Sequence, residues 1–197
     1  AHRRPETLQE LAKTWNNRHL ETILSRAAHI PKGYEQLVLQ EHKPDEHGGI
    51  SLQIRALGTC EIRREAEIIP QSKWQSAGAR ALFFYILDKG KARRDELALE
   101  FWPDFSNARV NSNFHTTLWR VRNALGKKNV IAFDGQYYSM HAEVEVFYDV
   151  REFESLLDRL NDADIPDVEC RSLGAQAIEL YAGDFLPDID MPWANMR

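Results

Sequence analysis

The sequence lacks most features that would support metal, redox or membrane chemistry. Its two cysteines, Cys60 and Cys170, lie far apart without a His or Cys at metal-ligand spacing, and we interpret them as reduced, buried thiols. No apolar run approaches the length needed to cross a bilayer, and the first residues show no signal-peptide pattern. We therefore expect a cytoplasmic protein with no membrane segment, no cofactor and no metal site.

The sequence also lacks the motifs of common enzymes. No Gly-rich phosphate loop precedes a helix, and Asp104, Ser112 and His115 do not form a recognisable nucleophile–base pair. The remaining histidines are not spaced with carboxylates as metal ligands, and we interpret three of them as surface residues: His29, His42 and His47. We predict that the chain is not an enzyme.

The most informative absence is that of acidic residues between Phe105 and Phe133. The whole chain has a formal net charge of −5, yet this stretch contains no Asp or Glu. Its cations are Arg109, Arg120, Arg122, Lys127 and Lys128. A local positive strip in an acidic protein indicates a polyanion at that strip. The alternative is a solvated amphipathic helix, although such faces usually mix charges of both signs.

Residues 107–125 within this strip have the pattern of a recognition helix. Apolar residues recur on one narrow stripe, as in a helix packed on a core: Phe114, Leu118, Val121 and Leu125. The opposite face carries cations, amides and hydroxyls without a carboxylate: Arg109, Ser112, Asn113, Thr116, Trp119, Arg120 and Asn123. Such side chains can bind phosphates and base edges in a major groove, which is wide enough to admit one helix.

The flanking segments predict an α+β fold, specifically a winged helix-turn-helix. Residues 51–69 alternate apolar and polar residues like three short antiparallel strands, and residues 76–89 and 95–101 have helical periodicity. Ser106 or Asn107 is expected to cap the third helix and Gly126 to end it. Residues 129–140 then predict a hairpin with Asp134-Gly135 as its two-residue turn. A small sheet, three helices with the third basic, and a hairpin wing describe that fold.

The wing tip is weakly suited to bind DNA through its turn. Asp134 would be repelled by phosphate, which leaves Gln136, Tyr137 and the preceding Lys127 and Lys128 as the favoured contacts.

The two ends of the chain have a different character. Residues 5–30 have helical periodicity, and residues after Met140 become acidic, with two helices around Phe153 and Leu173. That acidic region, which includes Asp149, is not expected to lie on DNA. We divide the chain into a helical segment and linker (1–49), a winged helix (50–141) and a truncated TPR-like domain (142–197), and expect it to be a piece of a longer protein.

Several motifs resemble one family of bacterial regulators. The segments RALGTCEIRR, ARALFFYIL, ELALEFWPD, FHTTLWRVRNALG, DGQYYSM and VFYDVREFESLL, and the pair YAGDFLPDID and MPWANMR, are similar to Streptomyces antibiotic regulatory proteins (SARPs). The resemblance covers about residues 50 to 197 and implies an OmpR-type winged helix followed by a bacterial transcriptional activator domain. Residues 1–49 are not covered.

This resemblance implies a transcriptional activator that binds direct repeats as tandem protomers and works with RNA polymerase. In relatives the matching positions reach bases and phosphates, and here they hold His115, Thr116, Trp119, Arg120 and Arg122. Trp119 stands where relatives often carry a cation or a polar residue, and Asp134-Gly135 replaces the usual basic wing tip. The full predicted DNA-binding set is Arg109, Ser112, Asn113, His115, Thr116, Trp119, Arg120, Arg122, Asn123, Lys127, Lys128 and Tyr137.

Three alternatives stay open on the sequence. The chain could be a protein-interaction scaffold built on a degenerate winged helix. Trp119 could pack on a neighbouring subunit or on the acidic helices. Arg122 lies near the edge of the apolar stripe, so a salt bridge to Glu96 or Glu100 competes with a phosphate contact.

Overall fold

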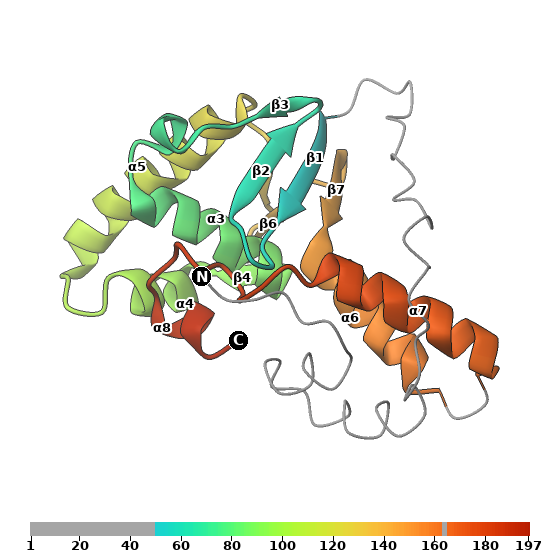
Figure 1. Ribbon diagram of the computed structural model, residues 1–197. Helices are drawn as coiled ribbons and strands as arrows, with labels where there is room; N and C mark the ends of the chain where they lie inside the picture. Colours follow the sequence, from blue (N-terminus) through green and yellow to red (C-terminus); the bar gives the residue numbers. More distant parts are fainter. Residues whose placement is uncertain (1–49, 163–164) are drawn as a thin grey trace. The chain divides into compact units, whose positions relative to one another are not determined.

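The computed structural model describes residues 50–162 and 165–197 (Figure 1). The helices predicted within residues 5–30, and the surface positions predicted for His29, His42 and His47, lie outside the described residues. The described elements mix helices with two sheets, so the fold is α+β, as predicted.

The described chain divides into two compact units. One contains residues 54–61 and 147–197, and the other contains residues 50–53 and 62–146. In this division residues 142–146 group with the helices that precede them, and residues 54–61 group with the C-terminal segment. The predicted winged-helix domain of residues 50–141 and the TPR-like domain after it stay a prediction.

The larger sheet contains the three N-terminal strands that the alternation predicts. They are β1 (Ile50–Arg55), β2 (Glu61–Arg64) and β3 (Glu67–Ile68), and β2 pairs antiparallel with β3. A fourth strand that we did not predict, β7 (Val144–Tyr148), gives the order β3-β2-β1-β7. Part of its signal was present, because Val144, Val146 and Tyr148 recur at every second position, although the apolar Phe147 interrupts the alternation.

The unit of residues 50–53 and 62–146 contains the three predicted helices. They are α3 (Ala77–Lys89), α4 (Arg94–Phe101) and α5 (Asn107–Leu125), preceded by a short 3-10 helix, η1 (Gln71–Trp74), that we did not predict. The Ser76 hydroxyl accepts a hydrogen bond from the Ala79 N–H at 3.1 Å, and Gly90 ends α3 as expected.

Buried aromatic residues join these helices. Helix α3 is buried from Ala79 to Leu87 and packs against α5 and η1. The rings of Trp74 and Phe83 lie 5.4 Å apart. The Tyr85 hydroxyl donates to Glu96 Oε1 at 2.7 Å, and burial together with that carboxylate raises the pKa of Tyr85. A bond between α3 and α4 therefore fixes the helix that precedes α5.

A second sheet forms the wing, and it has one strand more than predicted. The strands β4 (Lys91–Arg93), β5 (Ile131–Phe133) and β6 (Tyr137–Met140) pair antiparallel in the order β4-β6-β5. Strand β4 escaped the sequence analysis because Ala92 is its only apolar residue, and three residues carry no period.

The turn of the wing is shifted by one residue from the prediction. The Asp134 N–H donates to the Tyr137 carbonyl at 3.2 Å, which makes Gly135 and Gln136 the central residues instead of Asp134-Gly135. The Asp134 carboxylate accepts hydrogen bonds from the N–H groups of Gln136 and Tyr137 at 2.8 and 2.7 Å. These bonds lower the pKa of Asp134, so this acid has a structural role in the turn.

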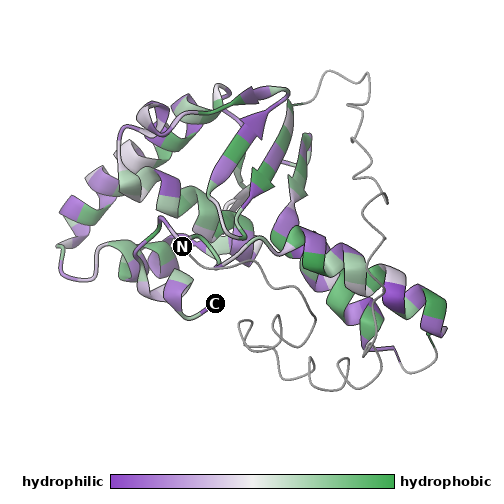
Figure 2. Cartoon of the chain, viewed as in Figure 1, coloured by the Kyte–Doolittle hydropathy of each residue, from purple (hydrophilic) through white to green (hydrophobic). Residues whose placement is uncertain are grey.

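The unit of residues 54–61 and 147–197 is built around two helices that lie side by side, α6 (Asp149–Leu160) and α7 (Asp167–Leu180) (Figure 1). Apolar and polar residues alternate along both helices in Figure 2. The four residues predicted to form the inner face of α6 are buried: Phe153, Leu156, Leu157 and Leu160. A short helix, α8 (Pro192–Asn195), ends the unit.

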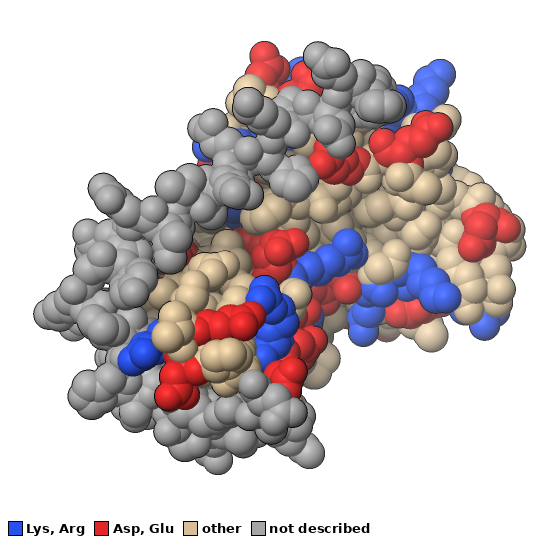
Figure 3. Space-filling model, turned by 90° about the vertical axis from the view of Figure 1, so that its right-hand side faces the viewer, with Lys and Arg blue, Asp and Glu red and all other residues tan. Residues whose placement is uncertain are grey.

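Arginines are interspersed with the acidic residues of this unit. Arg159 bonds Glu169 at 2.8 Å, and Arg197 bonds Glu154 at 2.5 Å. Figure 3 shows Lys and Arg beside Asp and Glu over the face that it presents. Two of the acidic residues on these helices are therefore paired with arginines, and the expectation that this region does not lie on DNA stays a prediction.

Asp149, an acidic residue of the same region, is buried, with 3% of its surface exposed. Its two oxygens each accept a hydrogen bond from the Ala56 N–H at 2.9 Å, and one accepts from the Leu57 N–H at 3.1 Å. Burial raises the pKa of the Asp149 carboxyl, and the bonds from Leu57 and Ala56 oppose that rise. The buried carboxylate thus joins the first turn of α6 to the segment after β1.

Asp149→Asn should lower the free energy of unfolding by about 1–3 kcal/mol at neutral pH, because the amide replaces one acceptor oxygen by an NH2 group that faces a backbone N–H donor. The raised pKa adds a pH dependence. The stability that this shift contributes is fully present below the pKa of Asp in the unfolded chain, and it is lost as pH rises through the higher pKa of Asp149 in the folded protein. The difference between wild type and variant should therefore shrink as pH rises.

Urea unfolding at a series of pH values measures both effects. Asp158→Asn on the exposed face of α6 is the matched control and should change stability little. Equal stability of the two variants, or a difference that grows with pH, would contradict this account of Asp149.

Candidate nucleic-acid interface

Helix α5 separates into a buried face and an exposed face, as its periodicity predicts. The predicted apolar stripe is buried at all four positions: Phe114, Leu118, Val121 and Leu125. Val110, Thr117 and Ala124 are buried as well. Phe114 packs against Tyr138 of the wing at a ring distance of 4.9 Å. Polar and apolar residues alternate along α5 in Figure 2. The opposite face is therefore held toward the outside of its unit.

The exposed face contains most of the predicted DNA-binding residues of α5. Arg109, Ser112, His115, Thr116, Trp119 and Asn123 are exposed, whereas Asn113, Arg120 and Arg122 are half-buried. The Thr116 hydroxyl donates to the Ser112 carbonyl at 2.9 Å, so its proton is already used within the helix. Its oxygen can still accept a hydrogen bond.

The start of α5 is held differently from the prediction. Ser106 occupies the N-cap position, but its side chain makes no capping hydrogen bond. Instead, the guanidinium of Arg109 lies 4.4 Å from the centre of the Phe105 ring. Arg94 Nη2 donates to Asn111 Oδ1 at 2.8 Å, which joins the first turn of α4 to the first turns of α5.

The end of α5 is fixed by a glycine and an arginine. Gly126 has a φ of 75°, the left-handed conformation expected of a helix-ending glycine. Arg64 of β2 donates from Nη1 to the Leu125 carbonyl at 3.1 Å. A Cβ at position 126 would lie 1.8 Å from that nitrogen. The absence of a side chain at Gly126 therefore lets Arg64 reach the end of the helix.

Arg122 bonds a backbone carbonyl and neither of the two glutamates considered from the sequence. Its Nη2 donates to the Ile131 carbonyl at 2.8 Å, so the alternative of a salt bridge to Glu96 or Glu100 is not realised, and the phosphate contact stays a prediction. Its buried Nε has no hydrogen-bond partner. The arginine thereby connects α5 to β5 of the wing and adds a positive charge at that junction.

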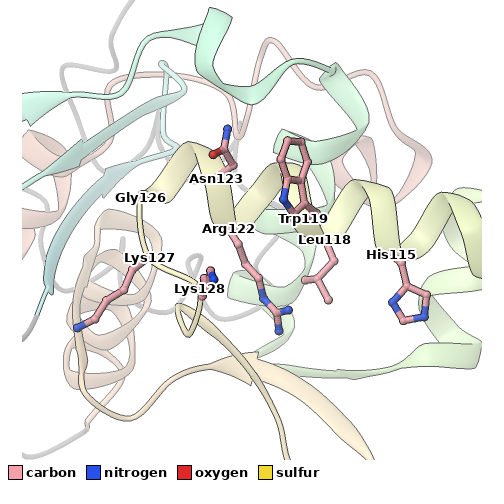
Figure 4. A pocket seen from close by; sticks show the side chains of 8 residues that line it. All are labelled: His115, Leu118, Trp119, Arg122, Asn123, Gly126, Lys127 and Lys128. Atoms are coloured by element: carbon pink, nitrogen blue, oxygen red, sulfur yellow. The ribbon is translucent and has the colours of Figure 1, made fainter.

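An open pocket lies beside the C-terminal half of α5 (Figure 4). Leu118 and Gly126 line it, together with six predicted DNA-binding residues. These six are His115, Trp119, Arg122, Asn123, Lys127 and Lys128. Figure 4 shows Trp119 and Asn123 pointing to one side of the helix, and His115, Leu118 and Arg122 to the other. No acidic residue lines the pocket. It is therefore suited to an anion.

The remaining predicted residues do not line this pocket: Arg109, Ser112, Asn113, Thr116, Arg120 and Tyr137. Tyr137 belongs to the wing and is half-buried, with Lys91 Nζ 4.8 Å from the centre of its ring. Lys91 is a cation that the sequence analysis missed, although it begins the basic run Lys91, Arg93 and Arg94. The strand pairing of β4 with β6 places Lys91 and Arg93 on the wing.

Two negative findings concern the described part of the chain. Among those residues, no group of three or more His, Cys, Asp and Glu side chains is arranged to hold a metal ion. Within residues 50–162 and 165–197, each helix is too short or too polar to cross a membrane.

The comparisons with known proteins support the fold. No protein-family model and no curated protein matches the sequence. Among solved structures, the chain is similar to Mycobacterium tuberculosis EmbR in complex with a low-affinity phosphopeptide, with a TM-score of 0.54 and 14% sequence identity. The likeness covers 75% of this chain and 40% of that chain. At this identity the similarity shows a winged-helix-like fold and assigns no activity.

Gly126→Ala should lower the free energy of unfolding by at least about 1 kcal/mol, because alanine is strained in the left-handed conformation. The added methyl group would also displace Arg64 from the Leu125 carbonyl. Thermal unfolding measures this loss. Gly78→Ala in α3 is the matched control, since Gly78 has open space around its Cα and should gain stability or stay unchanged. Equal melting temperatures would show that the glycine is not required.

Proposed function

We propose that this chain is a sequence-specific DNA-binding transcriptional activator that places α5 in the major groove. The observation that carries the proposal is the exposed face of α5, which contains no carboxylate and continues into Lys127 and Lys128. Base edges in the major groove are read by hydroxyl, amide and guanidinium groups of this kind. The buried stripe of α5 packs on α3 and the wing, so the helix is presented on a rigid support.

The pocket beside α5 provides a site for the DNA backbone. Lys127 and Lys128 are exposed and follow the helix directly, and Arg122 is held nearby by its bond to Ile131. Phosphate contacts of this kind fix the register of a helix on a duplex without reading its sequence. We assign Lys127 and Lys128 to phosphates, and Thr116 and Arg120 to base edges.

The proposed partners follow from this function. Double-stranded DNA is the first, and RNA polymerase is the second for an activator. Binding of two protomers to direct repeats is what the sequence resemblance to the Streptomyces antibiotic regulatory proteins implies. Such a protein would act in the cytoplasm of a bacterium. Tyr137 and Lys91 on the wing would lie beside the backbone contacts.

The competing function is a protein-interaction scaffold, which the 57% exposure of Trp119 favours. Affinity for a duplex distinguishes the two. A DNA-binding protein loses affinity steeply with added salt, whereas a scaffold of this kind has no duplex affinity to lose.

Lys127→Ala and Lys128→Ala should each reduce the slope of log affinity against log salt by about 1, and the double variant by about 2. The reason is that binding to DNA releases fewer counterions when one phosphate contact is lost. Fluorescence anisotropy titrations at several salt concentrations, on a duplex selected from a random pool, measure the slope. Arg171→Ala on α7 is the matched control and should leave the slope unchanged. An unaltered slope in the double variant would remove these lysines from the interface.

Arg120→Ala should weaken binding to the selected duplex by about 1–3 kcal/mol and relax base preference at one position, as expected for a lost base contact. Arg120→Lys keeps the charge and removes the paired donors, so it should recover nonspecific binding but not base preference. Gel-shift titration against the selected duplex and its single-base variants measures both properties. If Arg120→Ala binds the selected duplex with the affinity and base preference of the wild type, Arg120 does not contact a base.

A further inference from the structure

Trp119 has no explanation in the packing of α5. Its side chain is 57% exposed, although an indole is among the most costly groups to leave in water. It makes no ring stacking or cation–π contact in the part of the chain that the structure describes. The buried stripe of the helix is complete without it. An apolar group that is held outward in this way is suited to an apolar ligand.

The neighbours of Trp119 on the helix define what that ligand would meet. Ser112, Thr116 and Asn123 lie at spacings of seven, three and four residues from it, which places all of them on one exposed face. Figure 4 shows Asn123 and Trp119 pointing to the same side of α5. This central row contains two hydroxyls, one amide and one indole, and no charge.

The arginines of α5 flank this row. Arg122 is turned toward β5 by its bond to the Ile131 carbonyl, and Arg109 is held against the Phe105 ring. Arg120 is half-buried beside the exposed face. The positive charges of the helix therefore lie at the margins of the face, and its middle is left for groups that carry no charge.

A neutral row with a large apolar centre matches one feature of the major groove. Thymine is the only base of DNA that presents a methyl group there, and apolar side chains contact it. An amide such as that of Asn123 pairs with the N6 and N7 of adenine. We propose that Trp119 is a specificity-determining residue that covers the C5-methyl group of a thymine. This inference rests on the proposed DNA-binding function and assigns a base to the centre of that interface.

Replacement of thymine by deoxyuridine tests the proposal directly, because it removes the methyl group and keeps every hydrogen-bonding group. The full chain first selects duplexes from a random pool, and each thymine of the selected site is then replaced singly by deoxyuridine. Fluorescence anisotropy at fixed salt gives the affinity ratio of the thymine duplex to the deoxyuridine duplex for each variant.

Wild type should lose about fourfold in affinity at the thymine that Trp119 covers, the value expected for one buried methyl-sized group. Trp119→Ala should bind the two duplexes equally, and Trp119→Phe should keep part of the ratio. Phe133→Ala is the matched control, since Phe133 is an aromatic of similar exposure at 52% on the wing, and it should keep the wild-type ratio.

Each other outcome overturns the inference. If wild type shows no preference for thymine at any position, or if Trp119→Ala keeps the wild-type ratio, DNA binding stands and the role of Trp119 falls. If wild type selects no duplex at all, the proposed function and this inference fall together. Because Trp119 is exposed, circular dichroism should show an unchanged fold in the variants.

Discussion

The packing of Phe114 against the wing is the interaction on which the candidate interface depends. Its ring contacts Tyr138 of β6 and, at 6.4 Å, Trp102 at the end of α4. One buried ring therefore holds α5 against both the helix before it and the sheet after it. Because side chains in protein cores pack closely, rotation of α5 about its axis would break these contacts. The direction of the exposed face follows from that constraint.

Hydrogen bonds at the end of the helix add a second constraint. Arg64 reaches the Leu125 carbonyl, and Arg122 reaches the Ile131 carbonyl, so both arginines bond backbone oxygens instead of carboxylates. A guanidinium that is satisfied by a carbonyl keeps its charge uncompensated. Positive potential thereby accumulates around Lys127 and Lys128, which no acidic residue of the pocket offsets.

Periodicity predicted the parts of this arrangement that are local in sequence. The stripe from Phe114 to Leu125 and the helix end at Gly126 need only a 3.6-residue repeat and one glycine. Strand β4 carries a single buried residue and was invisible to any repeat. The partner of Arg122 and the burial of Asp149 were also missed, because each depends on a backbone group that the fold brings near from elsewhere in the sequence.

The close approach of Arg64 to Gly126 links two positions that are distant in the sequence. A Cβ at 126 and a guanidinium at 64 would occupy the same space, so a relative with a larger residue at 126 needs either a shorter residue at 64 or a different position for the end of its side chain. The two sites should consequently vary as a pair during evolution, and an alignment in which they vary independently would argue against this contact. At the junction of β2 and α5, a substitution at one of these two sites is therefore expected to be accompanied by a change at the other.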